Sequence, residues 1–335
     1  MQELLKNLCL AAGVSGDESE ALDAAEKLLA PLGKTERTVT HSIICRMPAV
    51  DENLPHVMLT AHIDQVGLMV TSITDKGFLK TAPCGGPDHR SASGARVIVH
   101  TKSGKLKGVV IATPPHLSDG KGNAPKPDGM TVDVGFCAEK ARELIEPGDR
   151  ITFDGEFTSL LGDRVCAPAM DDRSGCAAVI KAAELLRGCR TANVSVALVS
   201  QEETGSAGAS TAAFALQPDY AFAVDVSMAI TPDDSAEKCG EMGKGPMIGF
   251  SPILDRELSR KLIDVAKKKN IPWQTEIMSG RTGTDADYIA VSGKGVKTAC
   301  VSIPLRFMHT AAEVVSLADI ENTARLIAET VGGGL

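Results

Sequence analysis

Two adjacent carboxylates, Glu202 and Glu203, occur in the stretch VSVALVSQEETGSAGAS, residues 194–210. The run VSVALVS has the apolar pattern of a buried strand and glycines follow the glutamates, so both are expected where a strand ends. In open α/β sheets, ligands bind at the carboxyl ends of the strands. Successive side chains leave a strand on opposite sides, which predicts that one glutamate grips a metal ion and the other faces a substrate. A solvated acidic turn is the alternative for an isolated Glu-Glu pair.

Other acidic and imidazole side chains recur at the ends of predicted strands or at the start of a predicted helix. Each has an ordinary explanation when it is taken alone, as a helix cap, a turn residue or a hydrogen-bonded histidine. Their joint recurrence at strand ends favours one shared site. The set comprises His62, Asp64, Asp171, Asp172, Asp225 and His309, together with the two glutamates.

This set of side chains suits a pair of divalent metal ions. Two imidazoles with three carboxylates are typical ligands of Zn²⁺, Co²⁺ or Mn²⁺, and a bridging carboxylate would hold two ions about 3.5 Å apart. Asp171, Glu203 and Asp225 supply three negative charges and a bridging hydroxide a fourth, which balances two divalent cations. Without ions the crowded carboxylates would repel one another. The sequence therefore predicts two divalent ions, Zn, Co or Mn, as cofactors.

Strands alternate with helices in the two outer parts of the chain. Helical patterns near 4–10 and 21–29 precede a strand pair at 38–47 and 57–61, and alternation resumes near residue 166. Parallel strands separated by helices are typical of a layered α/β fold. We therefore expect a mostly parallel sheet with helices on both faces, built from residues 1–66 and 166–335 as a catalytic domain.

The segment 67–165 has a different texture. It contains short β-branched runs separated by glycine, proline and aspartate, and only one convincing helix, near 138–145. The pattern predicts an inserted all-β domain, resembling a barrel, that interrupts the α/β fold. A stretch rich in proline and glycine at 113–129 is expected to be a mobile loop.

Composition excludes several classes of partner. The chain has 335 residues, of which 43% are apolar, so it can form a large globular core. Its formal net charge of −8 disfavours binding to polyanions, and no nucleic-acid partner is therefore expected. The sequence shows neither a secretory leader nor a run of about 18 apolar residues, which predicts a cytoplasmic protein without a membrane partner. Nine cysteines without a C-x-x-C pair favour reduced thiols over a disulfide framework.

Six motifs, in this order, resemble those of the M42 family of dinuclear metallo-aminopeptidases, which includes the glutamyl and tetrahedral (TET) aminopeptidases: AHIDQVG, AMDDRSG, QEETGSAGA, AVDVS, RTGTDAD and FMHTAAEV. The resemblance implies that Asp171 bridges two ions. It also implies that the segment 67–165 corresponds to the family's dimerisation domain. The metal ligands implied by motif position are His62, Asp171, Glu203, Asp225 and His309.

The resemblance also implies two catalytic roles. Glu202 would be the general base, and Asp64 would accept the second N–H of the His62 ring and so fix its orientation. A cis peptide bond is expected between Asp171 and Asp172. The sequence departs from the family pattern at two places: Gln65 follows Asp64, and the last motif reads HTAAEV from His309. These departures bear on the metal preference, the pocket shape and the substrate range, and they leave the proposed ligands and base in place.

The sequence thus predicts a dinuclear aminopeptidase that removes N-terminal residues from short peptides. By resemblance, it would self-assemble through the inserted domain into dimers and then a tetrahedral dodecamer, and RTGTDAD would line the substrate pocket. A metal-dependent deacylase or carboxypeptidase on the same scaffold, and a non-catalytic metal-stabilised assembly protein, remain alternatives. A glycosidase is disfavoured, because aromatic residues make up only 3% of the chain and offer few sugar platforms.

Overall fold

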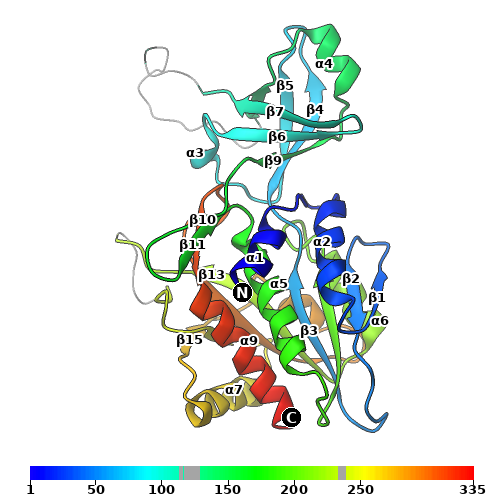
Figure 1. Cartoon of the computed structure of the whole chain (residues 1–335), viewed down its shortest axis with the longest axis vertical. Coiled ribbons are helices and arrows are strands. Elements are labelled where there is room, and N and C mark those ends of the chain that lie inside the picture. The colour runs from blue at the N-terminus through cyan, green and yellow to red at the C-terminus, as the bar shows by residue number, and fades with distance from the viewer. Residues whose placement is uncertain (113–115, 117–128, 233–238) are drawn as a thin grey trace.

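The computed structural model describes residues 1–112, 116, 129–232 and 239–335, and the expected mobile loop at 113–129 lies almost wholly outside these ranges. The described residues combine a helix-flanked mixed sheet with a barrel of shorter strands (Figure 1). This architecture confirms the expected α/β class. No helix of the described part is both long and apolar enough to cross a membrane.

The main sheet has eight strands. Its four central strands, β12, β3, β13 and β16, run parallel to one another, and antiparallel strands flank them on both sides. In spatial order the strands are β1 (Lys34–Arg37), β2 (Ile43–Arg46), β12 (Asn193–Val199), β3 (His56–His62), β13 (Tyr220–Met228), β16 (Lys297–Leu305), β14 (Met247–Phe250) and β15 (Gln274–Ile277).

One expected pairing is wrong. The strands predicted at 38–47 and 57–61 correspond to β2 and β3, but β12 lies between them, antiparallel to β2 and parallel to β3. The reason is burial. β12 is buried along nearly its whole length, and such an apolar strand belongs inside a sheet that is covered on both faces.

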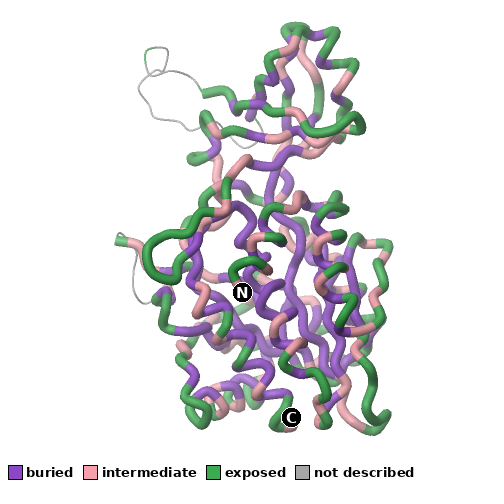
Figure 2. The backbone as a smooth tube through the Cα atoms, in the orientation of Figure 1, coloured by how far each residue is buried: buried purple, intermediate pink, exposed green. Residues whose placement is uncertain are grey.

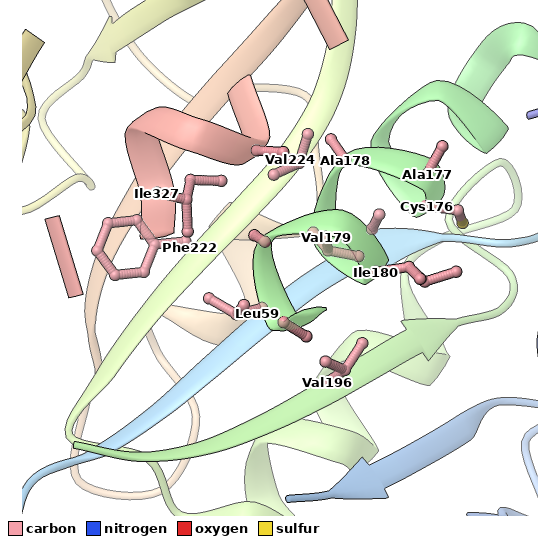
Figure 3. Packing of buried hydrophobic residues seen from close by; sticks show 14 of the residues in the cluster. Leu59, Cys176, Ala177, Ala178, Val179, Ile180, Val196, Phe222, Val224 and Ile327 are labelled. Carbon is pink, nitrogen blue, oxygen red and sulfur yellow. The ribbon is translucent and has the colours of Figure 1, made fainter. Parts of the chain in front are cut away.

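Helices cover both faces of the main sheet. Successive side chains of a strand point to opposite faces, so the buried central strands place apolar side chains on both. Odd-numbered residues of β3, such as Leu59, face one apolar cluster, and Met58 faces another. Figure 3 shows part of the first cluster, where Leu59 and Val196 lie beside the helix that carries Val179 and Ile180, and Phe222 lies beside Ile327 of another helix. The helices of this face are α1 (Gln2–Cys9), α2 (Ser19–Leu29), α5 (Met170–Leu185), α7 (Arg256–Lys269) and α9 (Leu317–Gly332); those of the other are α6 (Ala207–Leu216) and α8 (Ala286–Ile289).

The central helix α5 lies between the sheet and the outer helices. Almost every side chain from Met170 to Ala183 is buried, and Figure 2 shows the buried backbone concentrated along α5 and the central strands. The outer helices begin at capping side chains: Asp255 accepts the N–H of Leu258 at the start of α7, and Ser316 accepts that of Asp319 at the start of α9. These caps fix where each helix starts against the sheet.

Six strands between Gly67 and Phe153 close into a barrel with its own apolar core. Two short helices, α3 (His89–Ala92) and α4 (Ala138–Leu144), accompany it. The division of the chain at 67–165 stays a prediction. Around the barrel the strands follow the order β4 (Gly67–Ile73), β5 (Leu79–Cys84), β8 (Thr131–Asp133), β7 (Gly104–Val110), β6 (Arg96–Thr101) and β9 (Arg150–Phe153); a separate small sheet contains β10 (Thr158–Ser159), β11 (Arg164–Ala167) and β17 (Glu313–Ser316).

Candidate metal centre and active site

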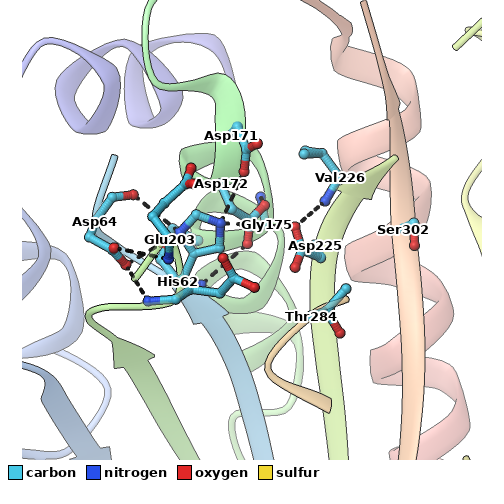
Figure 4. A network of polar contacts seen from close by, with 12 residues as sticks. His62, Asp64, Asp171, Asp172, Gly175, Glu203, Asp225, Val226, Thr284 and Ser302 are labelled. Carbon is cyan, nitrogen blue, oxygen red and sulfur yellow. Dashed lines mark hydrogen bonds and ion pairs between the residues drawn. The ribbon is translucent and has the colours of Figure 1, made fainter. Parts of the chain in front are cut away.

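The fold brings the predicted chemical groups together at the carboxyl edge of the main sheet (Figure 4). His62 ends β3, the two glutamates follow β12, and Asp225 lies near the end of β13. Because these strands are parallel, their carboxyl ends meet at one edge. Asp171 reaches the same place from the first turn of α5.

The Asp171 carboxylate lies between two imidazoles. Its Oδ1 is 2.9 Å from His62 Nε2, and its Oδ2 is 3.3 Å from His309 Nε2. The Asp171 side chain is buried, and the peptide bond to Asp172 is cis, as expected. Each oxygen of one carboxylate therefore faces a different histidine.

A further carboxylate lies beside each histidine. Glu203 Oε1 is 3.4 Å from His309 Nε2, and Asp225 Oδ1 is 3.9 Å from His62 Nε2. Glu203 Oε1 is buried and has no hydrogen-bond partner among the described residues, which is costly for a carboxylate oxygen unless a cation satisfies it. Such a mixed set of imidazole nitrogens and carboxylate oxygens fits a borderline divalent ion.

The acid-base properties of the cluster also favour a cation. Burial, and then the nearby Asp171 charge, raise the pKa of Glu203 to about 8, and burial raises the pKa of Asp225 well above its ordinary value. Burial alone would raise the pKa of Asp171, but hydrogen bonds with His309 and His62 lower it. Burial opposes protonation of His309, yet the Asp171 and Glu203 carboxylates raise its pKa to about 9. If all of these carboxylates were ionised, the cluster would carry more negative charge than two imidazolium rings neutralise, and a bound cation would favour the ionised forms.

Asp172 contributes to the centre in a way that its sequence context did not reveal. Its Oδ2 accepts the backbone N–H of His62 at 3.3 Å, and its Oδ1 accepts that of Gly175 at 2.9 Å. One group of possible ligand atoms within 4.8 Å of one another joins His62, Asp172 and Asp225, and a second joins His62, Asp171 and Glu203. Asp172 thus ties β3 to the start of α5.

Asp64 is close to His62, but its carboxylate accepts its hydrogen bonds from other residues. The nearest acceptor to His62 Nδ1 is the Asp64 backbone carbonyl, at 3.1 Å, whereas Asp64 Oδ1 is 3.5 Å away. The carboxylate accepts the backbone N–H groups of Glu202 at 3.1 Å and Glu203 at 3.3 Å, and the hydroxyl of Ser15. It therefore holds the turn that carries both glutamates.

Three groups that the sequence does not reveal orient His309 and Asp171. The buried Glu313 carboxylate accepts the N–H of Asp171 at 3.0 Å and that of His309 at 2.6 Å. The Gly86 carbonyl lies 2.8 Å from His309 Nδ1, and the N–H of Asp88 donates to the His309 carbonyl at 3.0 Å. The one signal for Glu313 in the sequence is its position, because it is an acidic residue directly before the apolar pair Val314 and Val315.

A pocket of about 430 Å³ opens beside the cluster. Glu202 lines it next to the candidate ligands, and burial raises the pKa of Glu202. Thr282, Gly283 and Thr284 of the RTGTDAD motif form another wall, and Gly283 has a positive φ of 73° that favours glycine. A small substrate can thus reach Glu202 and the histidines together.

A family model, M42 glutamyl aminopeptidase, matches residues 41–326. The chain belongs to the M42 peptidase family. It is therefore an enzyme, a peptidase of the aminopeptidase type, from a metal-dependent family whose expected ligand types are present among the described residues. The resemblance drawn from the six motifs is confirmed.

Individual relatives agree with the family. The M42 chain is 34% identical over 340 residues to the lysyl aminopeptidase of Pyrococcus furiosus, which covers 97% of this chain and 94% of that protein. An aminopeptidase structure from Desulfurococcus kamchatkensis superposes with a TM-score of 0.92 and 30% identity over 99% of this chain and 94% of that one. The Pyrococcus horikoshii TET1 peptidase, which can assemble into a tetrahedron or a large octahedral shell, superposes with a TM-score of 0.85 and 32% identity over 98% of both chains.

Proposed function

We propose that this M42 chain is a dinuclear metal-dependent aminopeptidase that removes N-terminal residues from short peptides. The observation that carries the proposal is the Asp171 carboxylate between two histidines. Its Oδ1 adjoins His62, which has Asp225 beside it, and its Oδ2 adjoins His309, which has Glu203 beside it. Two sets of donors that share one carboxylate are the arrangement expected for a pair of ions.

Each candidate ligand would hold an ion through the atom that faces the cluster: His62 and His309 through Nε2, and the carboxylates through their inward oxygens. When bound, two divalent ions polarise the scissile carbonyl and lower the pKa of an attacking water molecule. Zn, Co and Mn all suit this set of donors.

Glu202 is proposed as the general base. It lines the pocket, and Asp64 fixes its backbone. Its carboxylate takes a proton from water while the water oxygen attacks the carbonyl carbon, and then gives that proton to the leaving nitrogen as the peptide bond breaks. The positive charge of a free N-terminus suits the acidic wall of the pocket, which accounts for cleavage at chain ends.

The proposal is tested with chelator-stripped protein to which Zn²⁺, Co²⁺ or Mn²⁺ is restored. A panel of aminoacyl p-nitroanilides is assayed beside the same compounds with acetylated amines, and metal content is measured in parallel. We expect two ions per chain and cleavage of only the free-amine compounds. Release of acetate from the acetylated compounds, without release of p-nitroaniline from any compound, would establish the deacylase alternative, and two tightly bound ions without any turnover would establish a non-catalytic assembly.

We further propose that the barrel within 67–165 mediates dimerisation and that the dimers build a tetrahedral dodecamer. The assembly of the similar Pyrococcus horikoshii peptidase supports this proposal. Sedimentation velocity of the metal-loaded protein is the test. A stable monomer would contradict the assembly while leaving the proposed chemistry intact.

A further inference from the structure

A carboxylate separate from the metal cluster lines the same pocket. Glu276 of β15 faces it, and its two oxygens accept hydroxyl hydrogen bonds, from Ser227 at 2.5 Å and from Ser302 at 2.7 Å. Ser302 is the neighbour of Asp225 across the β13–β16 pairing, and Figure 4 shows the two on adjacent strands. Ser227 follows Asp225 by two residues and so points to the same side of β13.

These contacts fix the position of Glu276 relative to the reaction site. Its carboxylate lies against Ser302, one strand away from Asp225, and neighbouring strands are about 4.8 Å apart. A substrate whose scissile carbonyl lies at the Asp171 cluster can therefore extend its first side chain towards Glu276. The α-amine is one carbon from that carbonyl and stays near the cluster.

Glu276 has no cationic partner within the described ranges. No lysine or arginine there forms an ion pair with it, and its two partners are neutral hydroxyls. A half-buried carboxylate that faces a pocket without a counter-charge is a ready partner for a cation on a ligand.

Apolar side chains that line the same pocket suit an alkyl chain. Met278 follows Glu276 by two residues, directly after the end of β15, and Met228 and Met308 also line the pocket. Methionine side chains adapt to flexible apolar groups, and a lysine or arginine side chain buries its methylenes along such surfaces while its charged end stays paired.

We propose that Glu276 binds the cationic side chain of a lysine or arginine at the N-terminus of the substrate, and so directs this peptidase to peptides that begin with a basic residue. The inference rests on the proposed function, because it takes the scissile carbonyl to lie at the Asp171 cluster. Ser227 and Ser302 orient the carboxylate, the three methionines hold the methylenes, and Glu276 is the specificity-determining residue.

The decisive comparison is between lysine and norleucine p-nitroanilides, because the norleucine side chain has the same number of carbon atoms as that of lysine but no terminal ammonium. We expect the metal-loaded wild type to prefer the lysine compound. Glu276→Gln, which keeps the shape of the side chain, should lower kcat/KM for lysine roughly 30-fold or more and change that for norleucine less than about threefold. Glu257→Gln, which removes an exposed carboxylate on α7, is the matched control and should leave the preference intact.

Binding without turnover gives an independent measurement. In calorimetric titrations, the wild type should bind free L-lysine more tightly than L-norleucine, and Glu276→Gln should bind both equally. Glu276→Lys should move the preference towards glutamyl substrates.

Equal losses for lysine and norleucine in Glu276→Gln would overturn the inference and assign Glu276 a general role, such as holding the chain-end ammonium. A wild type that cleaves norleucine faster than lysine would overturn it as well. A wild type that cleaves no aminoacyl compound would contradict the proposed function, and the calorimetric comparison would still decide the role of Glu276.

Discussion

The Asp64 carboxylate accepts the backbone N–H of Glu202 at 3.1 Å through Oδ1, while its Oδ2 accepts the N–H of the next residue. Asp64 itself is fully buried, and it follows β3, whereas Glu202 follows β12. One acidic side chain thus sets the position of the proposed base from the neighbouring strand.

Asp64→Asn should damage catalysis through this turn. An asparagine offers a single oxygen, and its NH₂ group would point at a backbone N–H, so we expect a loss of about 1.5–3 kcal/mol in unfolding free energy. Displacement of Glu202 should lower kcat by roughly tenfold or more. Denaturant unfolding and steady-state kinetics measure both effects. Ser15→Ala, which removes only the hydroxyl that donates to Asp64, should have a smaller effect on each; a larger effect would contradict this account.

Glu202→Gln should separate chemistry from metal binding. The amide cannot take a proton from water, so we expect kcat to fall by about 10²–10⁴-fold. Metal content should stay near that of the wild type, because none of the candidate ligand groups includes Glu202. Kinetics and elemental analysis of the same preparation are the measurements. Turnover within a few-fold of the wild type would rule out Glu202 as the base.

His309→Ala should weaken one of the two proposed metal positions. The substitution removes the imidazole that adjoins Asp171 Oδ2 and leaves His62 in place. Titration with Zn²⁺ is expected to give one tight and one weakened site instead of two tight sites. His100→Ala, which removes an imidazole in the barrel, is the control. Two tight ions in His309→Ala would exclude His309 from the ligand set.

In the metal-free protein, the free energy of unfolding should decrease as pH rises. Glu203 has a folded-state pKa of about 8, raised above its ordinary 4.5, so the stability linked to its protonation is lost between these values. His309 acts in the same direction, because its pKa is raised from 6.5 to about 9 and its stabilising charge disappears through that range. Thermal unfolding of chelator-treated protein should therefore show a Tm that decreases from pH 5 to pH 9. The metal-loaded protein should show no such decrease, since metal ligands are deprotonated when ions are bound.

Periodicity and strand ends are sufficient to predict much of the candidate centre from the sequence alone. The apolar run before Glu202 does form a buried strand, and His62 and Asp225 do lie where parallel strands end. Local pattern carries this information because side-chain direction alternates along a strand and ligands gather at one edge.

Contacts between distant segments could not be predicted in this way. Glu313 reaches Asp171 across 142 positions of sequence, and no local pattern records such a contact. The same holds for the order of strands, where β12 separates β2 from β3. Glu276 was missed because β15 is short and alternates between half-buried and exposed residues, so nothing in the sequence distinguishes it from an ordinary edge-strand carboxylate.

The hydrogen bonds of Gly86 and Asp88 with His309 connect the barrel to the candidate metal centre. These two residues lie between β5 of the barrel and α3, and they hold both the ring and the backbone carbonyl of His309. A tilt of the barrel relative to the main sheet would pull directly on this imidazole. His309 is consequently a natural reporter, and its ring resonances in NMR spectra would register any event that shifts the barrel.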